Sequence, residues 1–187
     1  MTFAERRIVM KDGRPAVIRP VRMSDAESLA ACNRSVIAAG TGMTRELSQC
    51  AHTPEEVEAH ARELVSLAET GAGIALAAIV GDEVGGAGMI RRQPRRRVRH
   101  VGHIGVGIAP AFQGLGLGRA IMEGLIAWAR AQPNNAVSRV DLFVFADNVR
   151  AIRLYESLGF VVEGRRRRAV RYEDGRETDD LIMGLLL

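Results

Sequence analysis

Residues Val101 to Arg130 read VGHIGVGIAPAFQGLGLGRAIMEGLIAWAR and combine the signatures of a strand, a glycine-rich turn and a helix. Apolar side chains alternate along the first part, and Pro110, which has no N–H to donate to a neighbouring strand, ends it. Past the turn, apolar residues from Leu117 to Trp128 recur at the spacing of one helix face. The segment predicts a strand, a turn and a helix that packs on a sheet.

The turn holds three glycines, Gly114, Gly116 and Gly118. Glycine accepts positive φ and lets the backbone approach a ligand closely. The free N–H groups of the first helical turn then point at that ligand, and the helix dipole favours a negative charge there. The turn is therefore a predicted binding site for a diphosphate.

Two well-known nucleotide-binding patterns, the Rossmann fingerprint and the Walker loop, do not match this turn fully. A dinucleotide fingerprint needs G-x-G-x-x-G and an acidic residue at the end of the next strand. Here the turn is G-L-G-L-G, and the next acidic residue beyond the helix, Asp141, starts the following strand. A Walker loop needs a lysine beside its glycines, whereas Lys11 is the single lysine of the chain. A Rossmann-type dehydrogenase is thus the weaker alternative.

Two motifs resemble those of the GNAT superfamily of N-acetyltransferases. Gln113 to Gly118 resembles its acyl-CoA signature, Q/R-x-x-G-x-G/A, and Asn148 to Phe160, NVRAIRLYESLGF, resembles its later helix, N-x-x-A-I-x-L-Y-E-x-L-G-F. The resemblance runs from about residue 16 to 187 and is strongest from 99 to 163. It implies acetyl-CoA as the cofactor and one acetyltransferase domain over residues 1–187, with 1–15 as an N-terminal extension.

The resemblance also implies how the cofactor is held. The strands at 99–108 and 139–145 should separate, and the pantetheine arm should enter between them. The cofactor-binding residues implied are Val106, Gly107, Ile108, Gln113, Gly114, Leu115, Gly116, Leu117, Gly118, Arg119 and Asn148. The first three contribute main-chain hydrogen bonds to the arm, Asn148 bonds a pantetheine amide, and Arg119 meets a phosphate.

Tyr155 is the predicted catalytic residue. It follows Asn148 by about two helical turns, so we expect both side chains on one face, toward the separated strands. A phenol with an ordinary pKa of about 10 stays protonated at neutral pH and can protonate the departing thiolate of coenzyme A. The alternative is that Tyr155 is only a core residue with its hydroxyl at the rim.

The general base is left open by the sequence. Some relatives carry a glutamate two residues before the position of Phe145, but here that residue is Phe143. The remaining candidates are His103, Asp141, His100 and Glu83, or a chain of water molecules. His103 has the residue type whose ordinary pKa suits the task, although a lone strand histidine is more often structural.

The rest of the chain predicts an α/β (α+β) fold of the GNAT type, a mixed, mostly antiparallel seven-stranded sheet with helices on both faces. The strands expected are 16–22, 74–80, 83–92, 99–108, 139–145, 161–172 and 177–187. The helices expected are 24–38, from 54 to about 68, 117–130 and 148–158. Ser24 to Glu27 predicts one capping box and Thr53 to Glu56 another. Residues 39–52 are expected to form an irregular link, and the resemblance implies that this link forms a wall of the acceptor pocket.

Composition narrows the class of protein. With 47% hydrophobic and 26% charged residues, the 187-residue chain has the composition of a globular protein. No leader and no apolar run of about 18 residues is found, so a cytoplasmic location without membrane contact is expected. The net charge of +4 comes with only 4% aromatic residues, which argues against nucleic-acid binding. Cys32 and Cys50 lack metal-ligand spacing, so no metal site is expected.

The acceptor is the least determined part. Arginine-rich 91–96 and the tail from Tyr172 to Asp180 resemble a bacterial branch that acetylates free L-amino acids, so a small-molecule amine acceptor is expected. A polyamine or a protein amine is the alternative substrate, and an acyl-CoA-binding regulatory module without turnover is the alternative function. Edge strands of the C-terminal hairpin could pair in a homodimer.

Overall fold

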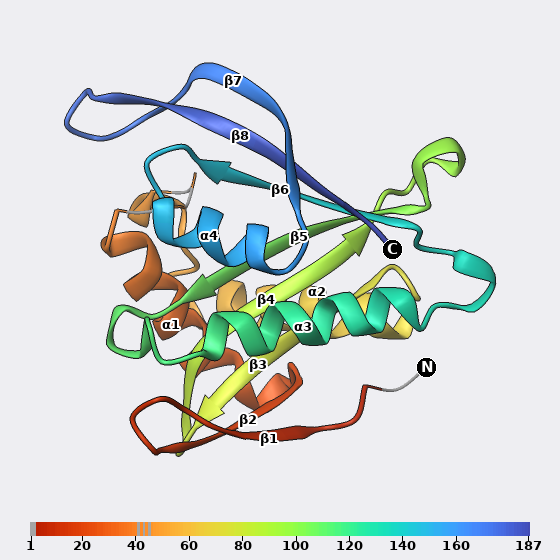
Figure 1. The fold of residues 1–187 in the computed structure, drawn as a ribbon. Helices are drawn as coiled ribbons and strands as arrows, with labels where there is room; N and C mark the ends of the chain where they lie inside the picture. The colour runs from red at the N-terminus through yellow and green to blue at the C-terminus, as the bar shows by residue number, and fades with distance from the viewer. Residues whose placement is uncertain (1–2, 41, 43, 45) are drawn as a thin grey trace.

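The protein is described by a computed structural model that covers residues 3–40, 42, 44 and 46–187. Its strands form one sheet in the order β1-β2-β3-β4-β5-β6-β8-β7 (Figure 1). The strands are β1 (Arg6–Val9), β2 (Pro15–Pro20), β3 (Gly73–Val80), β4 (Glu83–Arg92), β5 (Val101–Ile108), β6 (Arg139–Phe145), β7 (Val161–Arg171) and β8 (Glu177–Leu186). The helices are α1 (Ala26–Ala38), α2 (Pro54–Glu69), α3 (Leu117–Arg130) and α4 (Val149–Ser157). Within these residues β5 and β6 are parallel and the other neighbouring strands antiparallel, which confirms the predicted mixed sheet.

The prediction of seven strands was wrong by one, because β1 is an additional strand. Residues Arg6 to Val9 pair antiparallel with β2, so part of the expected N-terminal extension belongs to the sheet, which has eight strands among the described residues. The segment reads RRIV and leaves three of its four residues exposed. Main-chain bonds to β2 hold it there, without the alternating apolar pattern from which strands are recognised.

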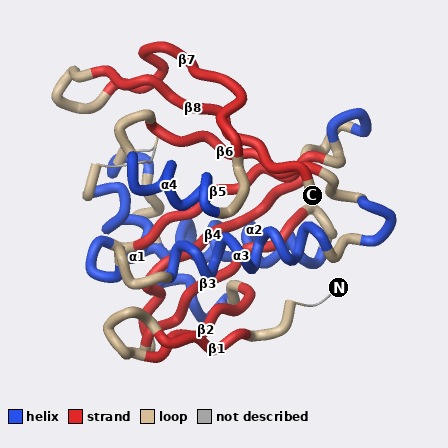
Figure 2. The backbone as a smooth tube through the Cα atoms, in the orientation of Figure 1, coloured by secondary structure: helices blue, strands red, loops and turns tan. Residues whose placement is uncertain are grey.

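Helices cover both faces of the sheet, as predicted (Figures 1 and 2). A Cβ at Gly107 of β5 would lie 3.3 Å from Val36 of α1, and a Cβ at Gly88 of β4 would lie 2.7 Å from Ile121 of α3. Because Gly88 is opposite Val106, these glycines face opposite sides. One face therefore packs on α1 and α2, the other on α3 and α4.

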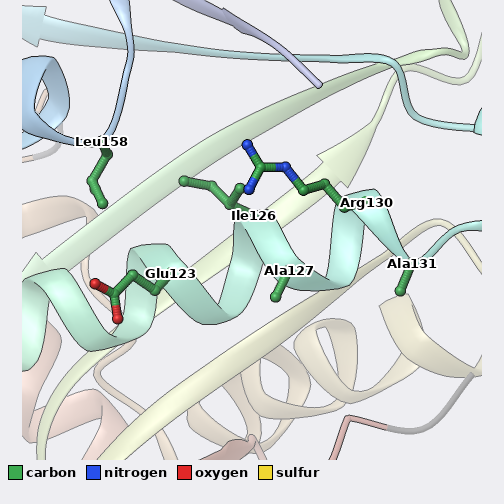
Figure 3. Close-up of a pocket in the computed structure, with 6 residues that line it drawn as sticks. All are labelled: Glu123, Ile126, Ala127, Arg130, Ala131 and Leu158. Carbon is green, nitrogen blue, oxygen red and sulfur yellow. The ribbon is translucent and has the colours of Figure 1, made fainter.

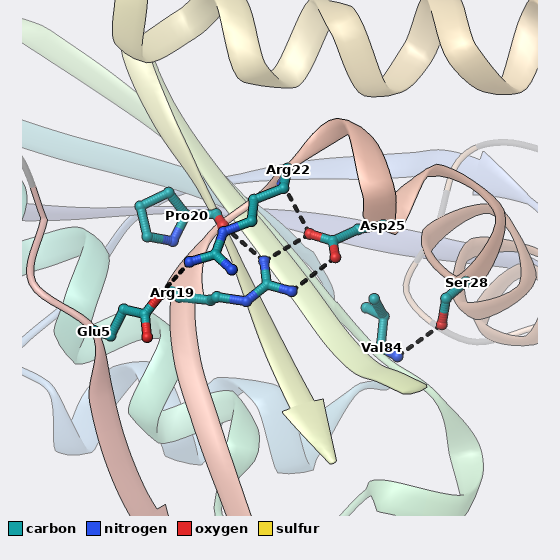
Figure 4. A network of polar contacts seen from close by, with 7 residues as sticks. All are labelled: Glu5, Arg19, Pro20, Arg22, Asp25, Ser28 and Val84. Atoms are coloured by element: carbon teal, nitrogen blue, oxygen red, sulfur yellow. Dashed lines mark hydrogen bonds and ion pairs between the residues drawn. The ribbon is translucent and has the colours of Figure 1, made fainter. Parts of the chain in front are cut away.

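The start of α1 differs from the expected capping box at Ser24 to Glu27. Asp25 is the acceptor instead, because its carboxylate takes a hydrogen bond of 2.8 Å from the Arg22 N–H and two of 2.7 Å from the Arg19 guanidinium (Figure 4). Ser28 accepts from the Val84 N–H and so joins α1 to β4. The capping box predicted at the start of α2, between Thr53 and Glu56, is confirmed.

The core lies between the sheet and its two helix layers. The predicted inner face of α3 is confirmed, since Leu117, Ile121 and Leu125 are fully buried and Trp128 nearly so. No helix within the described ranges is long and apolar enough to cross a membrane. Strand β7 is a sheet edge with Val161 exposed, and a homodimer through that edge stays a prediction.

The link between α1 and α2 contains a 3₁₀ turn at Leu47–Gln49. Residues 41, 43 and 45 of the predicted acceptor wall lie outside the described residues.

Candidate active site

Strands β5 and β6 separate after three paired positions. The pairs are Val101 with Arg139, Gly102 with Val140, and His103 with Asp141. Beyond them β5 continues to Ile108 and β6 to Phe145 without pairing to each other (Figure 1). The separation predicted from the resemblance is therefore present, and the last pair, His103 with Asp141, marks its closed end.

The separation leaves main-chain groups of β5 unused by the sheet. The Ala109 N–H bonds to the Gly85 carbonyl and the Gln93 N–H to the Val101 carbonyl, so odd-numbered residues of β5 bond to β4. Since both main-chain groups of a residue in an antiparallel pair point the same way, those of Val106 and Ile108 face the separation.

Gly107 differs from the prediction that its main chain bonds the pantetheine arm. As an odd-numbered residue it has its N–H and C=O directed to β4, opposite Ala87. Its lack of a side chain serves the packing of α1, because a Cβ there would come within 3.3 Å of Val36.

The glycine turn has the backbone that the sequence predicted. Gly114 has φ of 80° and Gly116 has φ of 101°, both in the left-handed region that glycine adopts readily. Gly116 is the N-cap residue of α3, and the first N–H bonded back into the helix is that of Ala120. The N–H groups of Leu117, Gly118 and Arg119 are thus open to an anion.

Three other predicted cofactor residues hold the turn in place through packing and hydrogen bonds within the protein. The Leu117 side chain is fully buried, so only its main chain can reach a ligand. The Leu115 carbonyl accepts from the Lys11 N–H at 3.1 Å. Gln113 donates to the Ile108 carbonyl at 3.0 Å, which fixes the end of β5 against the turn.

The arginine at the glycine turn is Arg150, which the sequence analysis missed. Its guanidinium donates to Gln113 Oε1 at 3.2 Å and lies 3.6 Å from the position of a Cβ at Gly114. The predicted phosphate ligand Arg119 instead bonds Ser157 at 2.6 Å and lies 3.7 Å from Glu123. Its position in the sequence could have indicated this role, because Arg150 stands two residues after Asn148 in the second motif.

Asn148 and Tyr155 lie at the two ends of α4. Asn148 precedes the helix as its N-cap, with Oδ1 accepting from the Ala151 N–H at 3.2 Å, so its Nδ2 group is the one left to donate. Because Asn148 is outside the helix, helical spacing does not by itself place it on the face of Tyr155. Tyr155 is 7% exposed, and its ring packs against Phe160.

The Tyr155 hydroxyl suits a proton donor. Burial raises the pKa of Tyr155 to about 12, so the phenol keeps its proton over the physiological range. Within the described residues, its hydroxyl has no hydrogen-bond partner.

The opposite face of the separated strands carries the candidates for the general base. His103 Nδ1 lies 2.8 Å from Asp141 Oδ1, and the His103 ring lies 4.9 Å from the ring of Phe143, centroid to centroid. Phe143 is 48% exposed, and a Cβ at Gly105 would have no atom within 4 Å. This face, on the side of α1 and α2, is therefore open for a second substrate.

The other two candidate bases lie elsewhere. Glu83 starts β4, beyond the residue that pairs with Ile108, so it is at the far end of β5 from His103. His100 precedes β5 and is exposed. Of the residues named from the sequence, only His103 and Asp141 meet at the closed end of the separation.

Ion pairs between β7 and β8 border the open face. The Arg166 guanidinium lies 4.4 Å from the centre of the Phe143 ring and pairs with Asp180. Asp180 is 3% exposed, and its Oδ1 has no hydrogen-bond partner among the described residues.

A pocket of about 370 Å³ lies at the N-terminus of α4. Tyr172 of the β7–β8 turn donates to Asp147 at 2.8 Å across it, and burial, followed by this bond, raises the pKa of Tyr172 to about 12. The lining residues are Gly40, Asp147, Asn148, Val149, Arg150, Tyr172 and Arg176. Gly40 begins the link after α1, and the role of that link as a wall of the acceptor pocket stays a prediction.

A larger hollow of about 510 Å³ lies along the outer side of α3 (Figure 3). Glu123 and Arg130 are its charged residues, and it extends to Ala131 at the end of α3 opposite the glycine turn. It contains none of the predicted site residues. The described part of the chain contains no cluster of histidine, cysteine, aspartate and glutamate that could hold a metal ion.

The fold matches solved acetyltransferases. An acetyltransferase of the GNAT family from Streptococcus pneumoniae superposes with a TM-score of 0.82 at 30% identity, over 92% of this chain and 99% of that one. A GNAT superfamily phosphinothricin acetyltransferase from Sinorhizobium meliloti, solved in complex with acetyl-CoA, superposes with a TM-score of 0.77 at 20% identity, over 92% and 88% of the two chains.

Sequence comparison gives shorter matches. An L-amino acid N-acetyltransferase of Escherichia coli is 34% identical over 94 residues, which are 48% of this chain and 53% of the relative. The chain spans between 21% and 53% of the length of the first curated relatives that it matches. The sequence profile of the Acetyltransferase (GNAT) family matches residues 42–160, more than half of the chain and both motifs of the site. This chain therefore belongs to the GNAT acetyltransferase family.

Proposed function

We propose that this protein transfers the acetyl group of acetyl-CoA to the primary amine of a small molecule, with a free L-amino acid as the acceptor. The observation that carries the proposal is the separation of β5 from β6. The glycine turn lies at its open end, and the main-chain groups of Val106 and the N–H of Ile108 face it without a partner among the described residues. An extended amide-containing chain can bond to those groups as a strand would. The turn at the open end supplies N–H groups for a diphosphate.

Bound acetyl-CoA supplies an activated thioester, and the residues of the chain supply position and a proton. The N–H groups from Leu117 to Arg119, with Arg150, hold the negative end of the cofactor. Asn148 Nδ2 is free to donate to an amide of the arm. Tyr155, protonated because of its raised pKa, donates its phenolic proton to the departing sulfur while the amine attacks the carbonyl carbon directly.

A free amino acid is favoured over a polyamine by the charges near the open face. A polyamine needs unpaired carboxylates at the open face, but Asp179 and Asp180 each pair with an arginine there. Two further acids of the tail, Glu173 and Asp174, lie in the turn between β7 and β8. The carboxylate of an amino acid needs a cation, and two arginines lie on the open face, Arg91 opposite His103 and Arg166 over the Phe143 ring. The amino-acid substrate of the Escherichia coli relative agrees with this choice.

The test measures thiol release from acetyl-CoA with each of the twenty L-amino acids, with spermidine and with a peptide amine, alongside calorimetry of coenzyme A binding. Turnover with amino acids supports the proposal, whereas turnover only with spermidine or peptide replaces the acceptor. Coenzyme A binding without any turnover would instead support the regulatory module. Binding of NAD without coenzyme A would revive the dehydrogenase alternative.

A further inference from the structure

We propose that His103 is the general base of this transfer and that Asp141 is the positioning residue that orients its ring. The inference rests on the proposed function and names the residue that the sequence left open. Four observations carry it: the location of His103, the bond made by its ring, the open space beside it, and the distance of the other candidates.

His103 stands where the reacting atoms should lie. The cofactor enters from the glycine turn after Ile108, and its thioester is at the end of the pantetheine arm far from the phosphates. His103 is five residues from Ile108, about 17 Å along an extended strand. It is also the last residue of β5 that pairs with β6. A thioester reaching the closed end of the separation therefore approaches His103.

The ring of His103 is held in one orientation. Its Nδ1 bonds to Asp141 Oδ1 at 2.8 Å, and Phe143 packs against the ring. A carboxylate can only accept hydrogen bonds, so Nδ1 carries the hydrogen and Nε2 of the neutral ring has the lone pair. The His103 side chain is 35% exposed, so a second substrate can reach it.

The space beside His103 is open on the same face. Gly105 is two residues further along β5 and therefore shares that face. A Cβ at Gly105 would meet no atom within 4 Å. An amine can thus lie over Gly105 between Nε2 of His103 and a thioester in the separation.

The proton balance of the step is complete. The nitrogen of the neutral amine forms a bond to the carbonyl carbon, the C–S bond breaks, and its electron pair stays on sulfur. Nε2 of His103 takes one proton from the amine nitrogen, and Tyr155 gives one proton to sulfur. Exchange of one proton between each residue and solvent restores both.

Charged groups lie around His103 on the same side of the sheet. Asp141 bonds it from β6, Arg91 lies opposite it on β4 and pairs with Glu63 of α2, and Arg166 of β7 lies over the ring of Phe143, which packs against His103. Both arginines pair with a carboxylate of their own, so Asp141 is the charged group that bonds the ring.

The experiment compares His103→Gln and Asp141→Asn with His100→Gln, a control that removes an exposed histidine from the start of the same strand. Thiol release is followed against pH with the acceptor that reacts fastest in the panel above. We expect His103→Gln to lower kcat/KM by about 100-fold to 1,000-fold and to flatten the acid limb of its pH profile. Coenzyme A affinity should not change, and His100→Gln should match the wild type.

Asp141→Asn separates orientation from catalysis. We expect a smaller loss that falls on kcat and not on KM, because an asparagine can turn its N–H₂ group to the ring and so no longer fixes which ring nitrogen carries the hydrogen. Added imidazole should restore part of the rate of His103→Ala, which a purely structural histidine would not allow. A wild-type rate and pH profile in His103→Gln would overturn the inference while leaving the acetyltransferase function in place.

A second readout does not need turnover. Diethyl pyrocarbonate acylates unprotonated imidazole nitrogens. His100 is only three residues from His103, so the His100→Gln variant is used, and mass spectrometry of the peptide that contains His103 then measures the acylation of His103 alone. Acetyl-CoA should protect His103 and leave His52 unprotected. A wild-type protein that releases no thiol with any acceptor contradicts the proposed function, whereas unprotected His103 in an active enzyme contradicts only this inference.

Discussion

Arg150 of α4 donates a hydrogen bond of 3.2 Å to Gln113, and Gln113 in turn donates to the carbonyl of Ile108 at 3.0 Å. The first turn of α4 is thereby tied to both the glycine turn and the end of β5. The contact joins the two motifs that identify the family. It also places a guanidinium, which pairs with no carboxylate among the described residues, beside the proposed diphosphate site.

Replacing this cation should weaken cofactor binding. We expect Arg150→Gln to raise the dissociation constant of coenzyme A by about 10-fold, because hydrogen bonds to a charged partner contribute about 1.5 kcal/mol or more. Calorimetry at two salt concentrations measures this dissociation constant. The difference in affinity between wild type and Arg150→Gln should be smaller at high salt. Arg153→Gln, an exposed arginine of the same helix, is the control, and equal affinities in both variants would contradict the assignment.

Removing the phenolic hydroxyl should slow the chemical step and little else. In Tyr155→Phe the ring still packs against Phe160, so stability and coenzyme A affinity should be retained while kcat falls by about 100-fold. Because the pKa of Tyr155 is about 12, the pH profile of kcat should keep its shape below pH 11 and lose only height. Unchanged kcat would mean that Tyr155 is only a core residue.

Filling the open space at Gly105 should block the acceptor. Gly105 has no positive φ and no neighbour within 4 Å of a Cβ, so Gly105→Val adds volume without backbone strain. We expect kcat/KM for the amine to fall by about 10-fold or more, with Gly105→Ala intermediate and the affinity for coenzyme A unchanged. Equal acceptor kinetics in the three proteins would show that the amine approaches from elsewhere.

Asp25 should control stability in a pH-dependent way. Burial raises the pKa of its carboxyl, but the bonds from Arg19 and the Arg22 N–H outweigh burial and leave the pKa below its usual 3.8. A lowered pKa in the folded state means that the stabilisation is complete above the unfolded value and disappears as the pH falls through the folded value.

The variant Asp25→Asn tests that sign. It removes the anionic partner of the 11% exposed Arg19 side chain and should lower the free energy of unfolding at pH 7 by about 3 kcal/mol. The difference from wild type in urea unfolding should shrink below about pH 4. Asp12→Asn, which removes an exposed pair with Arg14, should leave the urea midpoint unchanged, and a pH-independent difference would contradict the assignment.

Local features of the chain determined the turn and the helices of the site. Positive φ at Gly114 and Gly116, the buried face of α3 and the cap of α2 depend on residues a few positions apart, and short-range patterns record such interactions. The order of strands and helices follows for the same reason. The two family motifs then identify the fold.

Tertiary structure alone decided which distant residues meet. His103 and Asp141 are 38 residues apart, and Arg150 and Gln113 are 37 apart. Both contacts depend on the register and early end of the β5–β6 pairing. That pairing joins two strands separated along the chain by α3, so it depends on how the sheet assembles and not on residues a few positions apart. The addition of β1 and the choice of Asp25 over Ser24 depend likewise on partners brought in by the fold.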